Sequence, residues 1–206
     1  MITDSGGVRR LRAKESFFDG LSSSWHRENR LTSRERELVL SALLPGELSR
    51  SGPILDLGGG TGRLVEFLRP LTDTRLLVFD LSGRMLSQSP PVPFLRVQGD
   101  AHYLPLRDRS VGLIICYCAF PHFDRKEMVI RECQRILRPG GGLVILHSCG
   151  REDINRFHSA QQEVIAGDLL PPLPTFRSWG IASGMIPERL QNSRECFLVR
   201  YRNPVP

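Results

Sequence analysis

Several features are scarce in this chain of 206 residues, and each scarcity excludes a class of protein. The longest apolar stretch, residues 111–121, is shorter than the about 20 residues that a membrane-spanning helix requires. The first residues lack the apolar core of a secretory signal. The five cysteines are odd in number and form no CxxC pair, which indicates free thiols in a reducing compartment. The sequence therefore predicts a soluble, cytoplasmic protein without a membrane span.

Lysine is also scarce, because all but two of the 28 basic residues are arginine. With 22 acidic residues the formal net charge is +6, but the arginines are scattered and cluster tightly only at residues 9–12. A nucleic-acid binder gathers such charge into a stripe. We therefore expect general surface charge and no nucleic-acid partner, although a mild attraction to anionic partners stays open.

The order of helical and apolar segments predicts the fold class. Helical patterns at residues 14–27 and 31–44 precede short, continuous apolar runs of the kind found in strands covered on both faces. Helical segments separate these runs, which indicates βαβ crossovers and a doubly wound, mostly parallel α/β sheet. The expected strands are 53–57, 75–79, 94–97, 111–117 and 142–147, and the expected helices between them are 62–70, 82–89 and 124–137.

The C-terminal part is less regular. Residues 152–166 have a helical pattern and are followed by a proline-rich loop at 170–174. Residues 196–201 form the last apolar run, and 185–190 form a weaker one in which Pro187 would be confined to the edge of a sheet. This strand pair predicts a last strand inserted antiparallel.

A glycine-rich loop follows the first expected strand. Asp56, Gly58, Gly60 and Gly62 have the pattern D-x-G-x-G-x-G, in which glycines allow tight turns and close approach of a ligand to the backbone. The next helix would offer unpaired N–H groups to an anion. The dinucleotide pattern G-x-G-x-x-G fails, because arginine or valine stands where its third glycine is needed. The ligand anion is therefore small, such as a carboxylate, unless the loop is only a structural turn.

Acidic residues end the next two expected strands. Asp80 lies 20 residues after Gly60, where a carboxylate accepts hydrogen bonds from ribose hydroxyls; the alternative is that it caps the next helix. Asp100 would accept an adenine amino proton while the N–H of Ala101 meets a ring nitrogen. Because these groups lie at one edge of the sheet, they predict a site for an adenosine that carries an amino-acid carboxylate.

Five segments together resemble the S-adenosylmethionine-dependent class I methyltransferases, in particular the methyltransferase type 11 (ubiquinone/menaquinone methyltransferase-like) group. They are residues 54–64, 77–81, 99–106, 111–122 and 135–145. The resemblance implies a Rossmann-like sheet of seven strands with the last antiparallel, and S-adenosylmethionine as the cofactor. One departure is Ser110-Val-Gly112, where the family usually has S-F-D before a strand.

The resemblance also implies roles for individual residues. The aspartate and glycines of the loop would surround the methionine portion, and Asp80 would hold the ribose. Leu81 would lie beside the adenine, whose edge Asp100 and Ala101 would recognise. Cys116 would lie where the fourth strand passes the cofactor.

These expectations combine into one domain organisation and one activity. We expect a disordered tail at residues 1–13 and a single domain at 14–206, with a helical cap (14–48), a cofactor-binding core (50–147) and an acceptor-side segment with the final strands (148–206). The apolar stripe of Phe17, Leu21 and Trp25 would form a lid or simply pack on the core. The predicted activity is in-line methyl transfer to a small-molecule acceptor. The alternatives are a cofactor-binding regulatory or scaffold module and, less favoured, a nicotinamide-dependent oxidoreductase.

Catalytic residues are poorly specified by the sequence. His122, His147 and His158 follow the fourth and fifth strands, and a histidine acts as a base near neutral pH. These histidines and the nearby thiols lack a recognised metal-ligand spacing, so we expect no metal. No partner is predicted for His26 or His102.

Overall fold

The computed structural model describes residues 5–28, 30–50 and 52–205. Its centre is a seven-stranded sheet in the order β3-β2-β1-β4-β5-β7-β6. Neighbouring strands are parallel except that β7 runs antiparallel to both β5 and β6. This confirms the predicted α/β fold and the antiparallel last strand. The strands are β1 (Ile54–Leu57), β2 (Leu76–Asp80), β3 (Leu95–Gln98), β4 (Val111–Tyr117), β5 (Leu137–His147), β6 (Ile186–Asn192) and β7 (Phe197–Arg202).

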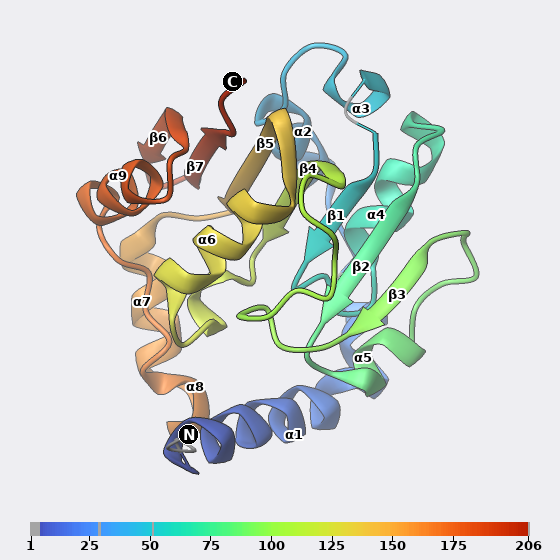
Figure 1. Cartoon of the computed structure of the whole chain (residues 1–206). Coiled ribbons are helices and arrows are strands. Elements are labelled where there is room, and N and C mark those ends of the chain that lie inside the picture. Colours follow the sequence, from blue (N-terminus) through green and yellow to red (C-terminus); the bar gives the residue numbers. More distant parts are fainter. Residues whose placement is uncertain (1–4, 29, 51, 206) are drawn as a thin grey trace.

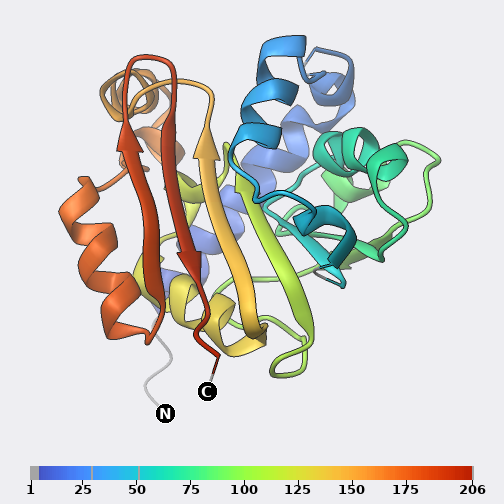
Figure 2. The ribbon, with the colours of Figure 1, turned by 90° about the horizontal axis from the view of Figure 1, so that it is seen from above.

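Helices pack on both faces of the sheet. The described helices are α1 (Ser5–Glu28), α2 (Ser33–Ser41), α3 (Glu47–Arg50), α4 (Arg63–Leu68), α5 (Gly83–Ser87), α6 (Lys126–Ile136), α7 (Arg151–Ser159), α8 (Glu163–Ala166) and α9 (Leu173–Ala182), with short 3-10 turns η1 (Arg69–Leu71) and η2 (Phe120–His122). Figure 2 shows α9 (orange) beside the edge strand β6 and α6 (yellow) behind the strands. One apolar core joins the sheet to α6 and α9, and the other joins it to α2, α4 and α5. The strands β1, β2, β4, β5 and β7 contribute residues to both cores, which explains their continuous apolar runs.

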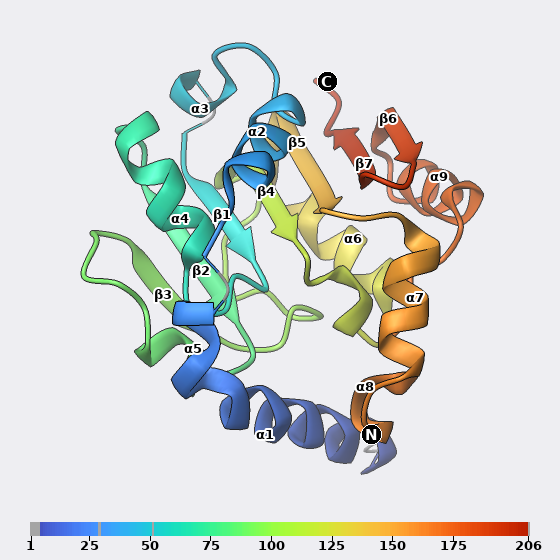
Figure 3. The ribbon, with the colours of Figure 1, turned by 180° about the vertical axis from the view of Figure 1, so that it is seen from behind.

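The helix α1 lies across the carboxyl ends of the strands, from α5 to α8 (Figures 1 and 3). It begins at Ser5, so the predicted disordered tail at residues 1–13 is wrong for residues 5–13. The reason is tertiary, because Arg10 and Lys14 form ion pairs with Asp124 and Asp168. No pattern within α1 itself reveals these partners. Among the described helices, none is long and apolar enough to span a membrane.

The start of α2 is fixed locally by a capping box. The Thr32 hydroxyl accepts from the N–H of Glu35 at 3.2 Å, and the Glu35 carboxylate accepts from the N–H of Thr32 at 2.9 Å. This reciprocal pair satisfies two N–H groups at the helix start. The sequence predicted a helical pattern at 31–44, and α2 begins two residues later, at Ser33, and ends three residues earlier, at Ser41.

The C-terminal segment differs most from prediction. The helix expected at 152–166 is divided into α7 and α8, and α9 (Leu173–Ala182) follows where no helix was expected. Pro174 lies in the first turn of α9, where proline costs no helical hydrogen bond. A proline-rich sequence therefore concealed a helix start. The strand β6 forms the sheet edge, as Pro187 predicted.

Candidate functional site

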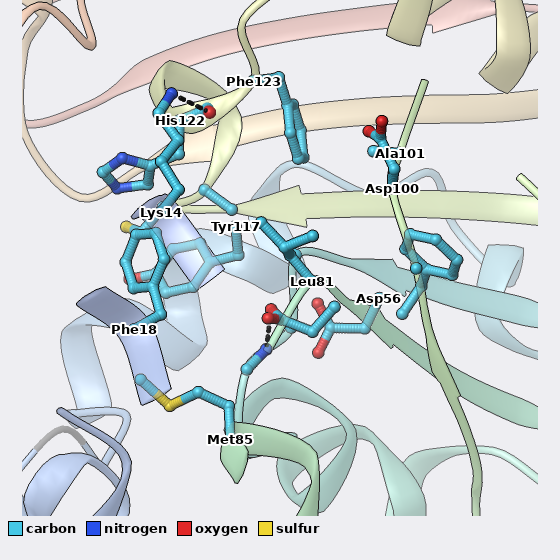
Figure 4. A pocket seen from close by; sticks show the side chains of 18 of the residues that line it. Lys14, Phe18, Asp56, Leu81, Met85, Asp100, Ala101, Tyr117, His122 and Phe123 are labelled. Atoms are coloured by element: carbon cyan, nitrogen blue, oxygen red, sulfur yellow. Dashed lines mark hydrogen bonds between the residues drawn. The ribbon is translucent and has the colours of Figure 1, made fainter. Parts of the chain in front are cut away.

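A pocket opens at the carboxyl edge of the sheet, beneath α1 (Figure 4). Its floor consists of the β1–α4 loop, the ends of β2 and β4, and the loop that follows β3. The residues that the sequence predicted for the site and that line this pocket are Asp56, Gly58, Gly60, Asp80, Leu81, Asp100, Ala101 and His122. The structure thus brings together groups from four separate strand ends, at the edge where open α/β sheets bind ligands.

The glycine loop has left-handed backbone at its key positions. Gly58 has a φ of 73° and Gly60 a φ of 56°, conformations that side chains disfavour. A Cβ at Gly58 would lie 2.5 Å from the Cβ of Ala119, so this glycine permits close packing of two loops. Gly62 is not among the lining residues; it is the N-cap of α4, with a φ of 78°.

Asp56 is a buried carboxylate that faces the pocket. It is 2% exposed, and its Oδ2 has no hydrogen-bond partner among the described residues. Burial raises its pKa to about 8, an effect that the nearby charge of Asp80 adds to and that of Arg63 opposes. A buried acceptor without a donor is costly. A ligand donor at this position would remove that cost.

Asp80 binds the glycine loop directly. Its Oδ2 accepts from the N–H of Gly60 at 2.8 Å, and its Oδ1 accepts from the N–H of Ser82 at 2.8 Å. The N-cap of α5 is Ser82, whose hydroxyl accepts from the N–H of Met85. The alternative that Asp80 caps this helix is therefore wrong. Burial is the main cause that raises the pKa of Asp80.

Asp100 is held in place by a neighbour for which no partner was predicted. Its Oδ1 accepts from the N–H of His102 at 3.0 Å and also contacts Nδ1 of the same ring. The ring's Nε2 accepts from the N–H of Arg125 at 3.0 Å. Burial raises the pKa of Asp100, but the hydrogen bonds from His102 outweigh burial and leave it below its ordinary value. The sequence predicted no partner for His102, but in the structure both of its ring nitrogens form hydrogen bonds.

The end of β4 reaches the pocket later than predicted. Cys116 is fully buried in the core on the α6 and α9 face and is not a lining residue. The residues that line the pocket instead are Tyr117, Cys118 and Ala119. The pocket begins at Tyr117, the last residue of β4 and one position after Cys116. Cys118 has a φ of 54°, unusual for a residue with a side chain.

The wall opposite the glycine loop comes from α1, and sequence reasoning missed most of it. The lining residues of this helix are Leu11, Lys14, Phe18 and Trp25; of the predicted stripe only Trp25 lines the pocket. The Nζ of Lys14 is 2.7 Å from the carbonyl oxygen of His122 and from Oδ1 of both Asp124 and Asp168. The helical spacing of residues 11, 14, 18 and 25 is visible in the sequence. A lysine among these apolar residues gave no sign that this face of the helix forms a pocket wall.

The three candidate histidines have different surroundings. His122 lines the pocket, and its Nδ1 lies 2.9 Å from Oδ2 of Asp168. His147 and His158 are buried outside the pocket lining, and each has a ring nitrogen without a partner among the described residues. Burial lowers their pKa values to about 3 and about 4, so both are neutral near pH 7. The side chain of His26 lies outside the described residues.

Within the described part of the chain, no group of three or more His, Cys, Asp or Glu side chains is placed to hold a metal ion.

Comparisons with known proteins agree with this geometry. Residues 55–145 match the family model described as "Methyltransferase domain". The chain is 31% identical over 149 residues to a demethylmenaquinone methyltransferase of Thermotoga maritima, covering 68% of this chain and 63% of that protein. It is 42% identical over 96 residues to a malonyl-[acyl-carrier protein] O-methyltransferase of Methylococcus capsulatus, covering 44% of this chain and 35% of that protein.

A solved structure extends the similarity to the whole fold. One chain of the complex between the Haloferax volcanii Trm112 methyltransferase activator and a methyltransferase has a TM-score of 0.69 at 17% identity. The match covers 99% of this chain and 100% of that chain. At this identity the likeness shows the fold alone. The two curated relatives are matched over only about one third and just under two thirds of their lengths.

Proposed function

We propose that this chain, which belongs to the S-adenosylmethionine-dependent class I methyltransferases of the type 11 group, binds S-adenosylmethionine in the pocket under α1 and methylates a small-molecule acceptor. The observation that carries this proposal is the convergence of the glycine loop, Asp80 and the Asp100–Ala101 turn on one pocket. A glycine loop that permits close approach, with carboxylates at successive strand ends, suits an adenosyl ligand.

Different residues of the pocket would contact different parts of S-adenosylmethionine. The glycine loop at 58–60, whose N–H groups donate to Phe79 and Asp80, would let the methionine portion approach the backbone closely, and Asp80 would accept from the ribose hydroxyls. Leu81 would pack beside the adenine, with Asp100 and Ala101 at its edge. Because Cys118 and Ala119 line the pocket and Cys116 does not, Cys118 and Ala119 would contact the cofactor in the role that the resemblance implied for Cys116.

The buried Asp56 supports the fit of this cofactor. Its Oδ2 has no donor among the described residues, and the methionine portion carries an ammonium group that would supply one. An opposite charge nearby favours the ionised carboxylate. Asp80 and Asp100 add negative charge around the same pocket, which complements a sulfonium cation.

The chain contributes mainly alignment to the reaction. Bound S-adenosylmethionine supplies a methyl group that is already activated by its sulfonium. The helix α1 covers the pocket with Phe18 and Trp25 and would exclude water, while the walls would align the acceptor with the methyl group. The acceptors named for the two curated relatives, demethylmenaquinone and malonyl-[acyl-carrier protein], make small or carrier-linked molecules the first to test.

Titration calorimetry with S-adenosylmethionine, S-adenosylhomocysteine and NAD tests the cofactor assignment. We expect the two adenosyl compounds to bind and to raise the melting temperature, and NAD to do neither. Binding of NAD alone would overturn the assignment in favour of the oxidoreductase alternative. Formation of S-adenosylhomocysteine with a panel of acceptors separates an enzyme from a regulatory or scaffold module, which would bind the cofactor without turnover.

A further inference from the structure

One pair of residues at the acceptor side of the pocket has a role that cofactor binding does not explain. We propose that His122, oriented by Asp168, is the general base that takes the acceptor's proton, so that the acceptor presents a weakly acidic hydroxyl group on an aromatic ring. This inference rests on the proposed methyl transfer. His122 follows β4 in η2, and Asp168 follows α8, so only the fold brings them together.

The surroundings of Asp168 fix which nitrogen of His122 carries the proton. Asp168 is 1% exposed, and its Oδ1 accepts from Lys14 at 2.7 Å and from Arg10 at 3.3 Å. Burial raises the pKa of Asp168, but the hydrogen bonds from His122 and Lys14 outweigh burial and hold it below its ordinary value. The carboxylate is therefore ionised, and its Oδ2 can only accept. Nδ1 of His122 must then donate, which leaves the lone pair on Nε2.

The Nε2 of His122 is the free position on this ring. The side chain is 19% exposed and lines the pocket, and among the described residues the ring forms its hydrogen bond through Nδ1 and none through Nε2. Phe18 and His158 contact the ring edge-on, with centroids 5.0 and 4.9 Å away. The imidazole is thus held between two rings, at the pocket wall formed by α1 (Figure 4).

Charged groups on several elements face His122. On one side are the anions Asp168 and Asp124, with the cations Arg10 and Lys14 that pair with them. Across the pocket, Asp80 is within electrostatic range of the imidazole. His158 and Lys126 lie on α7 and α6; burial lowers the pKa of each, to about 4 and about 8. Asp168 and Asp80 both favour the imidazolium that forms when the proton arrives.

The proton transfer balances without any further reactant. The acceptor's O–H bond breaks and its proton passes to Nε2, while an oxygen lone pair forms the new bond to the methyl carbon. The carbon–sulfur bond breaks and its electron pair stays on sulfur, which becomes a neutral thioether. The products are a methyl ether, S-adenosylhomocysteine and an imidazolium paired with Asp168.

The pocket walls indicate an uncharged aromatic acceptor. The pocket that His122 lines also contains Phe18, Trp25, Tyr117 and Phe123, whose rings suit an aromatic acceptor. The Lys14 ammonium already donates three hydrogen bonds, so it has none left for an acceptor carboxylate. A hydroxyl on an aromatic ring is mostly protonated at neutral pH and needs a base to react quickly.

The first test needs no acceptor. Nitrogen-15 NMR of histidine-labelled protein, with the His122→Asn variant to assign the signal, is expected to show His122 protonated on Nδ1 and unprotonated on Nε2 near neutral pH. In Asp168→Asn this preference should weaken, because a carboxamide can donate as well as accept. His122 protonated on Nε2 in the wild type would overturn the orientation.

The second test uses phenol and 4-nitrophenol as probes, since the nitro compound is substantially ionised at neutral pH. In His122→Asn we expect methylation of phenol to fall at least about 100-fold, with a much smaller loss for 4-nitrophenol. The acidic limb of the pH–rate profile should disappear with it. His147→Phe, which replaces a buried histidine outside the pocket lining with another ring, serves as the matched control and should retain both rates.

Calorimetry with S-adenosylmethionine separates this inference from the proposed function. If the wild type does not bind S-adenosylmethionine, the proposed function itself fails. If wild type and His122→Asn bind it equally but methylate phenol at equal rates, His122 is not the base. If the wild type binds the cofactor but methylates neither phenol nor 4-nitrophenol, the proposed acceptor class, an aromatic hydroxyl compound, is contradicted.

Discussion

The backbone N–H of Gly60 donates a hydrogen bond of 2.8 Å to the carboxylate of Asp80, joining the glycine loop after β1 to the end of β2. The two residues are 20 positions apart in sequence. Because the same carboxylate also accepts from Ser82, it is fixed at the floor of the pocket before any ligand binds. This preorganisation lowers the entropic cost of binding.

Asp80→Ala should weaken binding of S-adenosylmethionine by about 1–3 kcal/mol, because it removes a charged acceptor from the ribose position. Calorimetry gives the dissociation constant directly. Asp73→Asn, at an exposed position outside the pocket lining, is the control and should bind as the wild type does. An unchanged affinity in Asp80→Ala would mean that Asp80 only holds the loop.

Binding of S-adenosylmethionine should tighten as the pH rises from about 6 to about 8. Asp56 has a pKa of about 8 in the free protein, so it is mostly protonated at neutral pH. An ammonium beside it would favour the carboxylate, and binding would then release a proton. Affinity measured against pH, with Asp56→Asn as the comparison, checks this, since the asparagine variant should lose that dependence.

The same carboxyl should make the ligand-free protein less stable at higher pH. Its folded-state pKa lies above the ordinary value of 3.8, so between these two values the folded chain binds a proton that the unfolded chain does not. The free energy of unfolding should fall as the pH rises through this range, by up to about 1.4 kcal/mol per pH unit from this group. Urea unfolding at several pH values should show a shallower fall in Asp56→Asn.

His147 should have the opposite effect in acid. Burial lowers its pKa from 6.5 to about 3, so the unfolded chain takes up a proton at this residue before the folded chain does. Its contribution is complete above pH 6.5 and is lost as the pH falls toward 3. His147→Phe, which keeps an aromatic ring, should lose less stability over this range than the wild type. Parallel curves for the two proteins would show that His147 does not titrate in this way.

Lys14 and Arg10 offer a matched pair on α1, since both contact Asp124 and Asp168. Lys14 is 2% exposed, whereas the Arg10 side chain is 52% exposed. Lys14→Met should reduce the free energy of unfolding by about 3 kcal/mol or more, because it removes the main partner of a buried carboxylate. Arg10→Met should cost about 1 kcal/mol or less. Hydrogen exchange in α1 should increase in Lys14→Met only. Equal losses of unfolding free energy in the two variants would show that Lys14 is not the main partner of the buried carboxylate.

The sequence predicted those parts of the fold that depend on local pattern. The strands β1, β2 and β4 lie within a residue of their expected bounds. A short, continuous apolar run is typical of a parallel strand that is covered on both faces. Thr32 and Glu35 set the start of α2 through contacts three residues apart. The prolines before α9 were misleading, since the same residues end one segment and begin a helix.

Local pattern also determined the floor of the pocket. Glycines with positive φ and carboxylates at strand ends are specified by residue type and spacing, so Asp56, Gly58, Gly60, Asp80 and Asp100 were found before the fold was known. The tertiary structure decided the rest. Contacts between residues more than 40 positions apart place α1 over the pocket and His122 against Asp168, and they depend on how helices settle on the sheet. The tertiary structure likewise decided that Tyr117, Cys118 and Ala119, and not Cys116, line the pocket, because a side chain's exposure depends on where its strand ends relative to its neighbours.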